Sequence, residues 1–363
     1  MRRKAIPAMG NNRGIALLIT LAVITVLMTI TVELNRRARS SITAAAAARN
    51  RMTLEAMASS GIQGAMALLI QDKINDPPSG LDSIQEKWAD SEGLTALAQS
   101  LAFESGAVEI KITDELSKIQ VNTLVQFPGG KEANNLQMFL WERFIRIAEL
   151  SGEDMAEFEP RTIINSLKDW LDSGDDDAIT GMNGAESDYY QSLDPPYECK
   201  NGPLNHLDEL TLIRGVTPEL YYGLEGMFGI SNYATTTMGP PGNGQNDYFT
   251  GKINLNTAEL PVIAALLPEG SEMLGPNILE YREEMSEDVY IHDLSNINWY
   301  KNASGCSDLK IDEALITGFS DYFKIESKAS MGDMDLSVTA LIQRVKKADT
   351  GKWECKVLSW QQE

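Results

Sequence analysis

Histidine and cysteine are scarce in this 363-residue sequence, which contains two histidines and three cysteines. Two histidines argue against a multi-histidine metal centre, and three cysteines allow at most one intramolecular disulfide. Basic residues are also in the minority, since 31 lysines and arginines stand against 52 acidic residues and the net charge is −21. Because nucleic-acid phosphates require a basic surface, we expect no nucleic acid as a partner.

Catalytic motifs are missing as well. The sequence contains no HExxH, GxSxG, Walker or CxxC pattern, and nothing marks a pair of carboxylates as acid and base across a substrate. We therefore expect that the protein is not an enzyme. Hydrophobic residues make up 43% of the chain, which is enough for two or three folded domains.

One segment is apolar enough to span a bilayer. Residues 15–32 contain no charged side chain, and about 20 apolar residues cross the hydrocarbon as a helix. Residues 1–14 contain basic side chains and no acid, whereas a secretory signal would need a small-residue cleavage site after the run, which residues 33–37 do not provide. An uncleaved signal anchor is the alternative, and basic residues on both sides leave the orientation open.

The junction at residue 14 resembles that of type IV prepilins, in which a basic leader ends in glycine before a long apolar helix. The resemblance implies that residues 1–14 are a leader peptide, that a prepilin peptidase cuts after Gly14, and that Ile15 becomes N-methylated. Most members have glutamate at the fifth mature residue, which is Ile19 here. That glutamate is paired with the terminal amine of a neighbouring subunit, so a subunit with no neighbour above it would not need it.

The helix is expected to continue past the membrane. Residues 43–73 lack proline, and apolar residues recur there at helical spacing. These residues are Leu54, Met57, Ile62, Ala65, Met66 and Leu69. We therefore predict a transmembrane and amphipathic spine helix over residues 15–75, which the prolines after Asp76 end.

Period-two alternation predicts strands at both ends of the remaining chain. Residues 107–113 and 118–122 are predicted to form a hairpin. Three further strands are predicted at Tyr322–Ser330, Leu336–Val345 and Trp353–Trp360. The fold class is therefore α+β, with a long N-terminal helix and an antiparallel sheet domain over residues 76–126 plus 318–363.

Residues 127–317 have helical character and are predicted to be an inserted all-α domain. Helices are expected at Gln137–Leu150, Glu157–Leu171, Leu207–Leu212, Pro218–Leu224, Ala258–Leu267 and Asn277–Met285. A weak repeat between residues 119–124 and 253–258 suggests two modules, each with an Asn-Thr pair that could cap a helix. The modules resemble helix-hairpin-helix or SAM-like units, but Glu269 and Glu272 stand where phosphate would bind.

Several short motifs resemble one family in particular. They are Asp169–Asp172, Gly184–Tyr190, Pro203–Leu204, Leu207–Leu210, Arg214–Val216 and Ile253–Ala258. With the leader, they resemble the minor pseudopilin of type II secretion called general secretion pathway protein K (GspK). The resemblance implies a pseudopilin fold with a large helical insertion, and a family that also tends to lack the glutamate at mature position five.

The same resemblance implies a structural role. The subunit would lie at the pseudopilus tip with minor pseudopilins of the I and J types and support export of folded proteins across the outer membrane. It would cross the inner membrane once, with its N-terminus cytoplasmic and its body periplasmic. The alternatives are a membrane-anchored periplasmic binding protein or DNA-uptake receptor, which the acid excess disfavours, and an anchored hydrolase, which lacks a motif.

An acidic loop is the candidate metal site. Six carboxylates without a basic residue among them occupy positions Asp172, Asp175, Asp176, Asp177, Glu186 and Asp188. Such a loop can be merely solvated, but Trp170 before it and Tyr189 and Tyr190 after it suggest anchored ends. Hard Ca²⁺ prefers oxygen ligands, and the family resemblance also implies calcium at this loop.

The cysteines leave two alternatives open. Cys199 and Cys306 both lie in the insert while Cys355 lies in a terminal strand, so Cys199–Cys306 is the favoured disulfide in an oxidising compartment. It would close a loop of about 100 residues and stabilise the fold by up to ~4–5 kcal/mol. Three free thiols are the other alternative.

Overall fold

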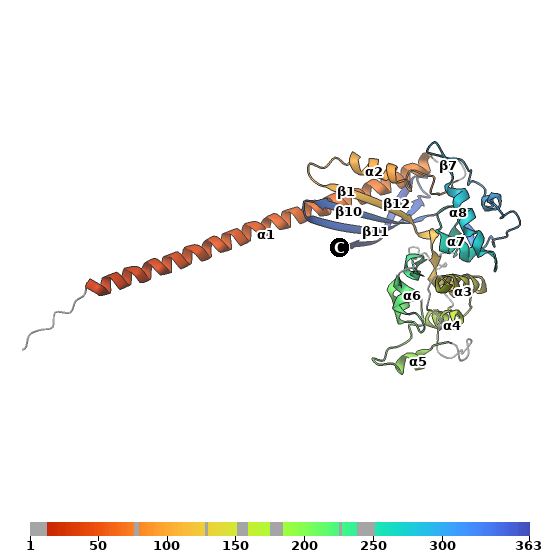
Figure 1. The fold of residues 1–363 in the computed structure, drawn as a ribbon, viewed down its shortest axis with the longest axis horizontal. Helices are drawn as coiled ribbons and strands as arrows, with labels where there is room; N and C mark the ends of the chain where they lie inside the picture. Colours follow the sequence, from red (N-terminus) through yellow and green to blue (C-terminus); the bar gives the residue numbers. More distant parts are fainter. Residues whose placement is uncertain are drawn as a thin grey trace, which may run out of the picture.

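The computed structural model describes residues 13–75, 80–127, 130–150, 159–174, 184–224, 227–237 and 251–363. Its longest element is α1 (Arg13–Asn75), a helix of 63 residues, which corresponds to about 95 Å. The first half of α1 projects from the body as a bare rod (Figure 1). An 18-residue stretch of this helix reaches a mean hydropathy of 2.7 with none of it buried, so α1 is long and apolar enough to cross a membrane.

The second half of α1 packs on the sheet through the predicted apolar stripe. Five of its residues, Leu54, Met57, Ile62, Ala65 and Leu69, are at most 2% exposed, and Met66 packs against the same core. Gly61 allows the close approach of helix and sheet, because a Cβ there would lie 2.2 Å from Ser327 Oγ and 2.9 Å from Val108 Cγ1. The helical period of the sequence therefore predicted both the helix and its buried face.

The sheet has four antiparallel strands in the order β1-β10-β11-β12. Their bounds are β1 (Ala107–Asp114), β10 (Tyr322–Met331), β11 (Met334–Lys346) and β12 (Trp353–Gln362). Helix α2 (Ser91–Ser100) begins at Asp90, whose carboxylate accepts hydrogen bonds from Glu92 N and Gly93 N, and packs beside β1. The alternating burial of β10 and β11 matches the period-two pattern of their sequences.

The predicted hairpin between residues 107–113 and 118–122 is wrong. Strand β1 pairs with the distant β10, and Ile112 lies opposite Ile325. The second segment contributes only β2 (Ile119–Gln120), which pairs in parallel with β5 (Ala234–Thr235). Alternation of apolar and polar residues indicates a half-buried strand, but it does not select the strand's partner.

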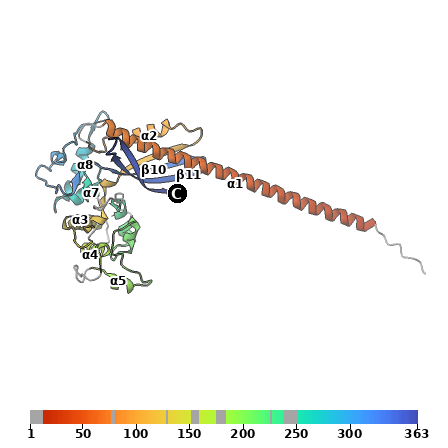
Figure 2. The same cartoon turned by 180° about the vertical axis from the view of Figure 1, so that it is seen from behind.

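The insert is built from short elements. Its α-helices are α3 (Asn135–Leu150), α4 (Pro160–Leu171), α5 (Ser187–Gln191), α6 (Pro218–Tyr222), α7 (Leu260–Leu266) and α8 (Gly275–Glu283). The predicted helix at Leu207–Leu212 is a 3₁₀ helix. Short strand pairs connect these helices: β3 (Gly223–Leu224) with β4 (Met227–Phe228), β6 (Ile253–Asn254) with β9 (Ile316–Thr317), and β7 (Met285–Ser286) with β8 (Val289–Tyr290). The α+β class is thus confirmed, and the insert extends sideways from the end of the sheet farthest from the start of α1 (Figures 1 and 2).

Two separate hydrophobic cores define the halves of the body. One lies between α1 and the sheet, and the other lies within the insert. Ile119, Val121 and Leu124 belong to the core of the insert, although the sequence boundary at residue 127 assigned them to the sheet domain. The insert therefore begins just after β1. The boundary was misplaced because a sequence pattern shows that an apolar residue is buried but not which core it enters.

The internal repeat corresponds to a structural duplication. Strands β2 and β6 each form a short parallel pair with a distant strand, β5 and β9 respectively. In the first copy the Gln120 Oε1 atom accepts a hydrogen bond from Asn122 N at 3.1 Å. In the second copy Asn254 Oδ1 accepts one from Asn256 N at 3.1 Å. The two copies therefore share the same side-chain-to-backbone hydrogen bond, although residues 121–124 form a 3₁₀ helix and residues 255–257 only a turn.

The asparagines of the repeat do not cap helices, in contrast to the sequence prediction. Asn122 exchanges two hydrogen bonds with the backbone of Leu204, at 3.0 and 2.8 Å. Asn256 donates to Gly318 O and accepts from Trp299 Nε1 at 2.7 Å. Each asparagine thus connects its module to a distant segment, which local sequence cannot reveal.

Candidate functional site

Three carboxylates from both ends of the acidic loop meet beside helix α4. Asp169 and Asp172 are three residues apart and so lie on one face of the helix end. Glu186 comes from the far end of the loop, and one carboxylate oxygen of each residue lies within 4.8 Å of the other two. Asp169 is fully buried and Asp172 is 4% exposed. The arrangement is a compact, largely desolvated group of hard oxygen donors.

The loop ends are anchored, as the flanking aromatic residues suggested. The Trp170 and Tyr190 rings meet edge to face with centroids 5.0 Å apart. Ala185 N donates to Asp169 Oδ2 at 2.9 Å, which attaches the returning chain to α4. Arg214 donates to Gly184 O at 2.9 Å. These contacts hold the two ends of the loop together independently of what the loop binds.

A buried lysine accompanies the three carboxylates. Lys168 Nζ lies 3.4 Å from Asp172 Oδ2 and 3.7 Å from Asp169 Oδ1, and its side chain is 3% exposed. Lys168 thus supplies one positive charge to this group of carboxylates. Isolated buried charges are strongly unfavourable. The donor set therefore fits one hard divalent cation such as Ca²⁺, which uses carboxylate, backbone and water oxygens.

The structure brings together only part of the predicted ligand set. Asp172 and Glu186 join the cluster, whereas Asp188 is exposed on α5 and lies outside it. Asp175, Asp176 and Asp177 lie outside the described residues. Asp169 was missed by sequence analysis, although its spacing of three from Asp172 on a predicted helix was a signal for a shared face.

A second carboxylate cluster lies where α1, the sheet and the insert meet. Asp72, Asp82 and Glu86 approach one another as closely as the first three do. Arg344 donates to Asp82 and Asp72 and to the backbone oxygens of Leu69 and Ser320, and Lys73 pairs with Asp82 at 3.1 Å. Two cations already accompany these carboxylates, so we interpret the cluster as a structural joint.

Glu86, a member of this joint, has a shifted pKa. Burial raises the pKa of Glu86 to about 7, and the nearby charge of Asp72 acts in the same direction. Its Oε2 atom accepts hydrogen bonds from Ser83 N at 3.1 Å and Trp88 Nε1 at 2.7 Å, which partly offset that rise. Burial likewise raises the pKa of Asp114, at the boundary between sheet and insert, to about 6.

The favoured disulfide is not formed in the structure. All three cysteines are free thiols, with Cys199 and Cys306 buried in the core of the insert. Cys199 Sγ contacts Asp169 O at 3.6 Å, while Cys306 Sγ contacts Ser304 O at 3.5 Å. Both cysteines lie in the core of the insert, as their shared domain predicted, but their sulfur atoms are not bonded to each other.

The predicted processing site lies at the free end of α1. Ile15 is 57% exposed and Ile19 is 58% exposed. A side chain built at Gly14 would meet no other atom within 4 Å. Nothing in the fold of the described residues therefore requires glycine at position 14.

In the hairpin that resembles a DNA-binding module, the carboxylate of Glu272 accepts a backbone hydrogen bond. Gly270, with φ of +83°, donates its backbone N–H to Glu272 Oε1 at 3.1 Å. That amide is one that a phosphate would need. The geometry thus disfavours nucleic-acid binding at this hairpin.

In the fold, a long N-terminal helix is packed on an antiparallel sheet that carries a large helical insertion. This fold resembles the crystal structure titled as the GspK-GspI-GspJ complex of the enterotoxigenic Escherichia coli type 2 secretion system, with a TM-score of 0.57 and 16% identity. The match covers 87% of this chain and 97% of that chain. At 16% identity this likeness shows the fold alone.

Sequence comparisons give matches to one family over part of the chain. The family model for type II secretion system protein K matches residues 117–228. Relatives named type II secretion system protein K are 26% identical over 223 residues in Aeromonas hydrophila and 25% identical over 214 residues in Klebsiella pneumoniae. Each alignment covers 59% of this chain and about three fifths of the relative, 62% and 61% respectively. Over these residues the chain is similar to type II secretion system protein K.

Proposed function

We propose that this chain is a structural, non-catalytic subunit at the tip of the type II secretion pseudopilus, where it supports export of folded proteins across the outer membrane. The observation that carries the proposal is the combination of a bare apolar helix with a laterally extended head. The helix offers a surface for like helices, as in pilin spines. The head widens the subunit at the end away from the membrane anchor (Figure 1).

The proposed partners are minor pseudopilins of the I and J types. The similar fold was solved in a complex titled with those two proteins, and α1 leaves an apolar stretch with none of its side chains buried. Ile19 offers no carboxylate to the terminal amine of a subunit above it, and the head would obstruct a regular position in the shaft. Both features suit a terminal position.

Immunogold electron microscopy of pseudopili built with the full chain tests this placement. We expect label at one end only. The variant Ile19→Glu is expected to stay at that end, because the head still prevents stacking. Label spaced along the shaft for the unaltered chain would contradict the tip assignment.

The proposal also includes insertion in the inner membrane, with a cytoplasmic N-terminus and a periplasmic body, and processing by prepilin peptidase. Mass spectrometry of the membrane-extracted protein is expected to show N-methylated Ile15 as the first residue. Gly14→Leu is expected to block cleavage without unfolding the body, since a Cβ atom there lies in open space far from the sheet and the insert. An intact Met1, or a cut beyond residue 32, would refute the prepilin assignment.

We further propose that Ca²⁺ binds at Asp169, Asp172 and Glu186, where it would balance buried negative charge and stabilise the insert. Ligand that binds only the folded state adds about 2.7 kcal/mol at a hundredfold excess over Kd. Calcium is therefore expected to raise the melting temperature, and a chelator to lower it. Magnesium should act more weakly, because its smaller octahedral shell suits a carboxylate cluster less well.

The variants for this test follow from the geometry. Asp169→Asn and Glu186→Gln should each reduce the calcium-dependent shift. Asp188→Asn is the matched control, because Asp188 is an exposed acid two residues from Glu186 and outside the cluster. A melting temperature insensitive to both calcium and chelator would exclude the site, and an equal loss in Asp188→Asn would place the ligands elsewhere.

A further inference from the structure

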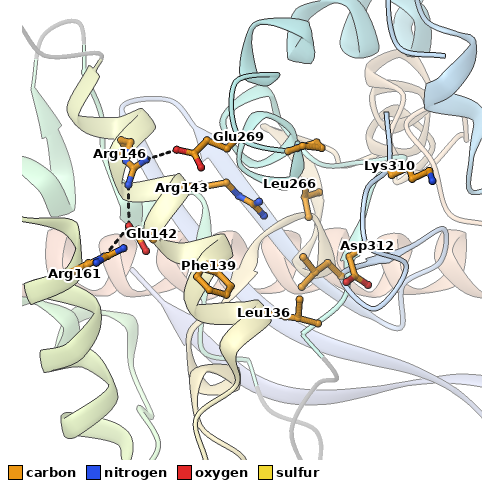
Figure 3. Close-up of a pocket in the computed structure, with 12 residues that line it drawn as sticks. Leu136, Phe139, Glu142, Arg143, Arg146, Arg161, Leu266, Glu269, Lys310 and Asp312 are labelled. Carbon is orange, nitrogen blue, oxygen red and sulfur yellow. Dashed lines mark hydrogen bonds and ion pairs between the residues drawn. The ribbon is translucent and has the colours of Figure 1, made fainter. Parts of the chain in front are cut away.

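A cavity of about 410 Å³ lies in the insert between α3, α4, the end of α7 and the segment before β9. Figure 3 shows its walls, with Arg143 extending from α3 toward Leu266 of α7. Leu136 and Phe139 form an apolar side of this pocket and are 40% and 59% exposed. The pocket therefore combines exposed apolar surface with basic side chains in a chain whose net charge is −21.

The acidic residues of the pocket are already engaged. Glu142 Oε1 pairs with Arg146 at 2.9 Å and with Arg161 at 3.4 Å. Glu269 pairs with Arg146 at 3.5 Å, and Asp312 Oδ1 accepts a hydrogen bond from Ala314 N at 2.9 Å. These contacts satisfy Arg146 and Arg161, as the dashed lines for the two arginines in Figure 3 show.

Two cations of the pocket differ from these. Arg143 and Lys310 form no hydrogen bond and no ion pair with any residue that the structure describes, although Glu269 and Glu272 attract Arg143 at longer range. The Nε atom of Arg143 is fully buried and has no hydrogen-bond partner in the described part of the chain. Burial lowers the pKa of Arg143 below its ordinary value. Arg143 is half-buried overall, and a partly desolvated guanidinium gains more from an incoming carboxylate than a solvated one does.

We propose that this pocket binds an acidic peptide segment of a protein partner, in which a carboxylate lies beside an apolar side chain. The carboxylate pairs with Arg143, which supplies paired donors in a fixed fork, and Lys310 adds a second positive charge on the facing wall. The apolar side chain packs on Leu136 and Phe139. The proposal goes beyond the structural role above, because it assigns a recognition site to the insert.

The test uses the full chain in a non-ionic detergent and two blocked peptides. In one peptide glutamates alternate with phenylalanine and leucine, and in the other glutamines replace the glutamates. Binding is measured by fluorescence anisotropy at low and high salt. We expect the glutamate peptide to bind and the glutamine peptide to bind at least about tenfold more weakly, because charge-assisted hydrogen bonds are stronger than neutral ones.

Variants then locate the site. Arg143→Gln is expected to weaken binding of the glutamate peptide by about tenfold. Phe139→Ala is expected to weaken both peptides alike, since it removes exposed apolar surface without opening a core. Lys356→Gln is the matched control, because Lys356 is an exposed cation on β12 that forms no ion pair within the described residues. Circular dichroism melts check that each variant is folded.

Three outcomes would overturn the proposal. The first is equal affinity for the two peptides, and the second is an equal effect of Arg143→Gln and Lys356→Gln. The third is preferential binding of phosphatidylglycerol vesicles that Arg143→Gln abolishes, which would make the pocket a lipid-phosphate site. If the Arg143 variant does not fold, Lys310→Gln is used instead. It removes the second positive charge of the pocket and should also weaken binding of the glutamate peptide.

Discussion

The sheet core and the insert core bury similar apolar side chains but are organised by different means. In the sheet core, β10 pairs along its whole length of 10 residues with the 13-residue β11, and α1 packs on both strands. In the insert core, each of the described strand pairs has two residues on either side. Side chains such as Asn122, Asn256 and Trp170 provide many of the long-range connections there. Long backbone ladders thus organise one half, and contacts between individual side chains organise the other.

Arg344 holds Asp82, whose backbone oxygen accepts a hydrogen bond from Asn254 of the insert. Breaking this joint between the two halves should have the largest effect. Arg344→Leu leaves Asp82 buried with less compensation, so we expect a loss of about 3–5 kcal/mol in the free energy of unfolding. Chemical denaturation followed by tryptophan fluorescence measures it. Lys328→Leu is the control, because the exposed Lys328–Asp335 pair should contribute at most about 1 kcal/mol. Equal, small effects of both variants would show that the joint does not hold the halves together.

The pH dependence of stability sharpens the comparison, because the shifted acids lie at the joint. The pKa of Glu86 is raised to about 7 in the folded protein, so the folded state binds this proton more tightly than the unfolded chain does. The stability contributed by that proton is present below about pH 4.5 and is lost as the pH rises toward 7. The loss amounts to up to about 3 kcal/mol, and the raised pKa of Asp114 acts in the same direction.

Glu86→Gln isolates this contribution. The variant keeps a similar shape and does not titrate, so its stability should fall less than that of the unaltered chain between pH 4.5 and 7. Denaturant titrations at several pH values provide the measurement. Parallel pH profiles for the variant and the unaltered chain would show that Glu86 does not carry the effect.

Within the insert, the repeated asparagines should each contribute less than the joint. Asn122→Ala removes both hydrogen bonds to Leu204, whose backbone groups then lose their partner in a buried site. We expect a loss of about 1–3 kcal/mol by thermal denaturation, and a similar loss for Asn256→Ala. Asn277→Ala is the control, because Asn277 is half-buried and, among the described residues, its side chain bonds only Ser304 O. If all three variants behave alike, the buried asparagines do not organise the insert.

The smallest effect concerns the thiols. A reducing agent should leave the melting temperature of the protein unchanged, because Cys199 and Cys306 are not bonded. A Cys199–Cys306 disulfide would instead add up to ~4–5 kcal/mol that a reductant removes. If a reductant lowers the melting temperature of the unaltered chain but not that of a Cys306→Ala variant, the Cys199–Cys306 disulfide does form.

Sequence analysis was most accurate where structure is periodic and local. The apolar stripe from Leu54 to Leu69 and the last three strands follow repeats of 3.6 and 2 residues, which reflect side-chain direction directly. The candidate metal site was found only in part. Asp172 and Glu186 were recognised within an acidic loop, but Asp169 becomes a member only because Ala185 N holds the returning chain against it. The pairing of β1 with β10 depends on chain segments more than 200 residues apart, and no local pattern specifies it.

The sequence by itself determined the long helix, its unburied apolar first half, the alternation of the strands and the excess of negative charge. These properties follow from the order of side chains along one element. Only the tertiary structure decided which strand neighbours β1, which core receives Ile119, which three acids meet beside α4 and which arginine of the pocket is left without an ion pair among the described residues. Each depends on the packing of distant segments, because contact and desolvation arise only once those segments come together.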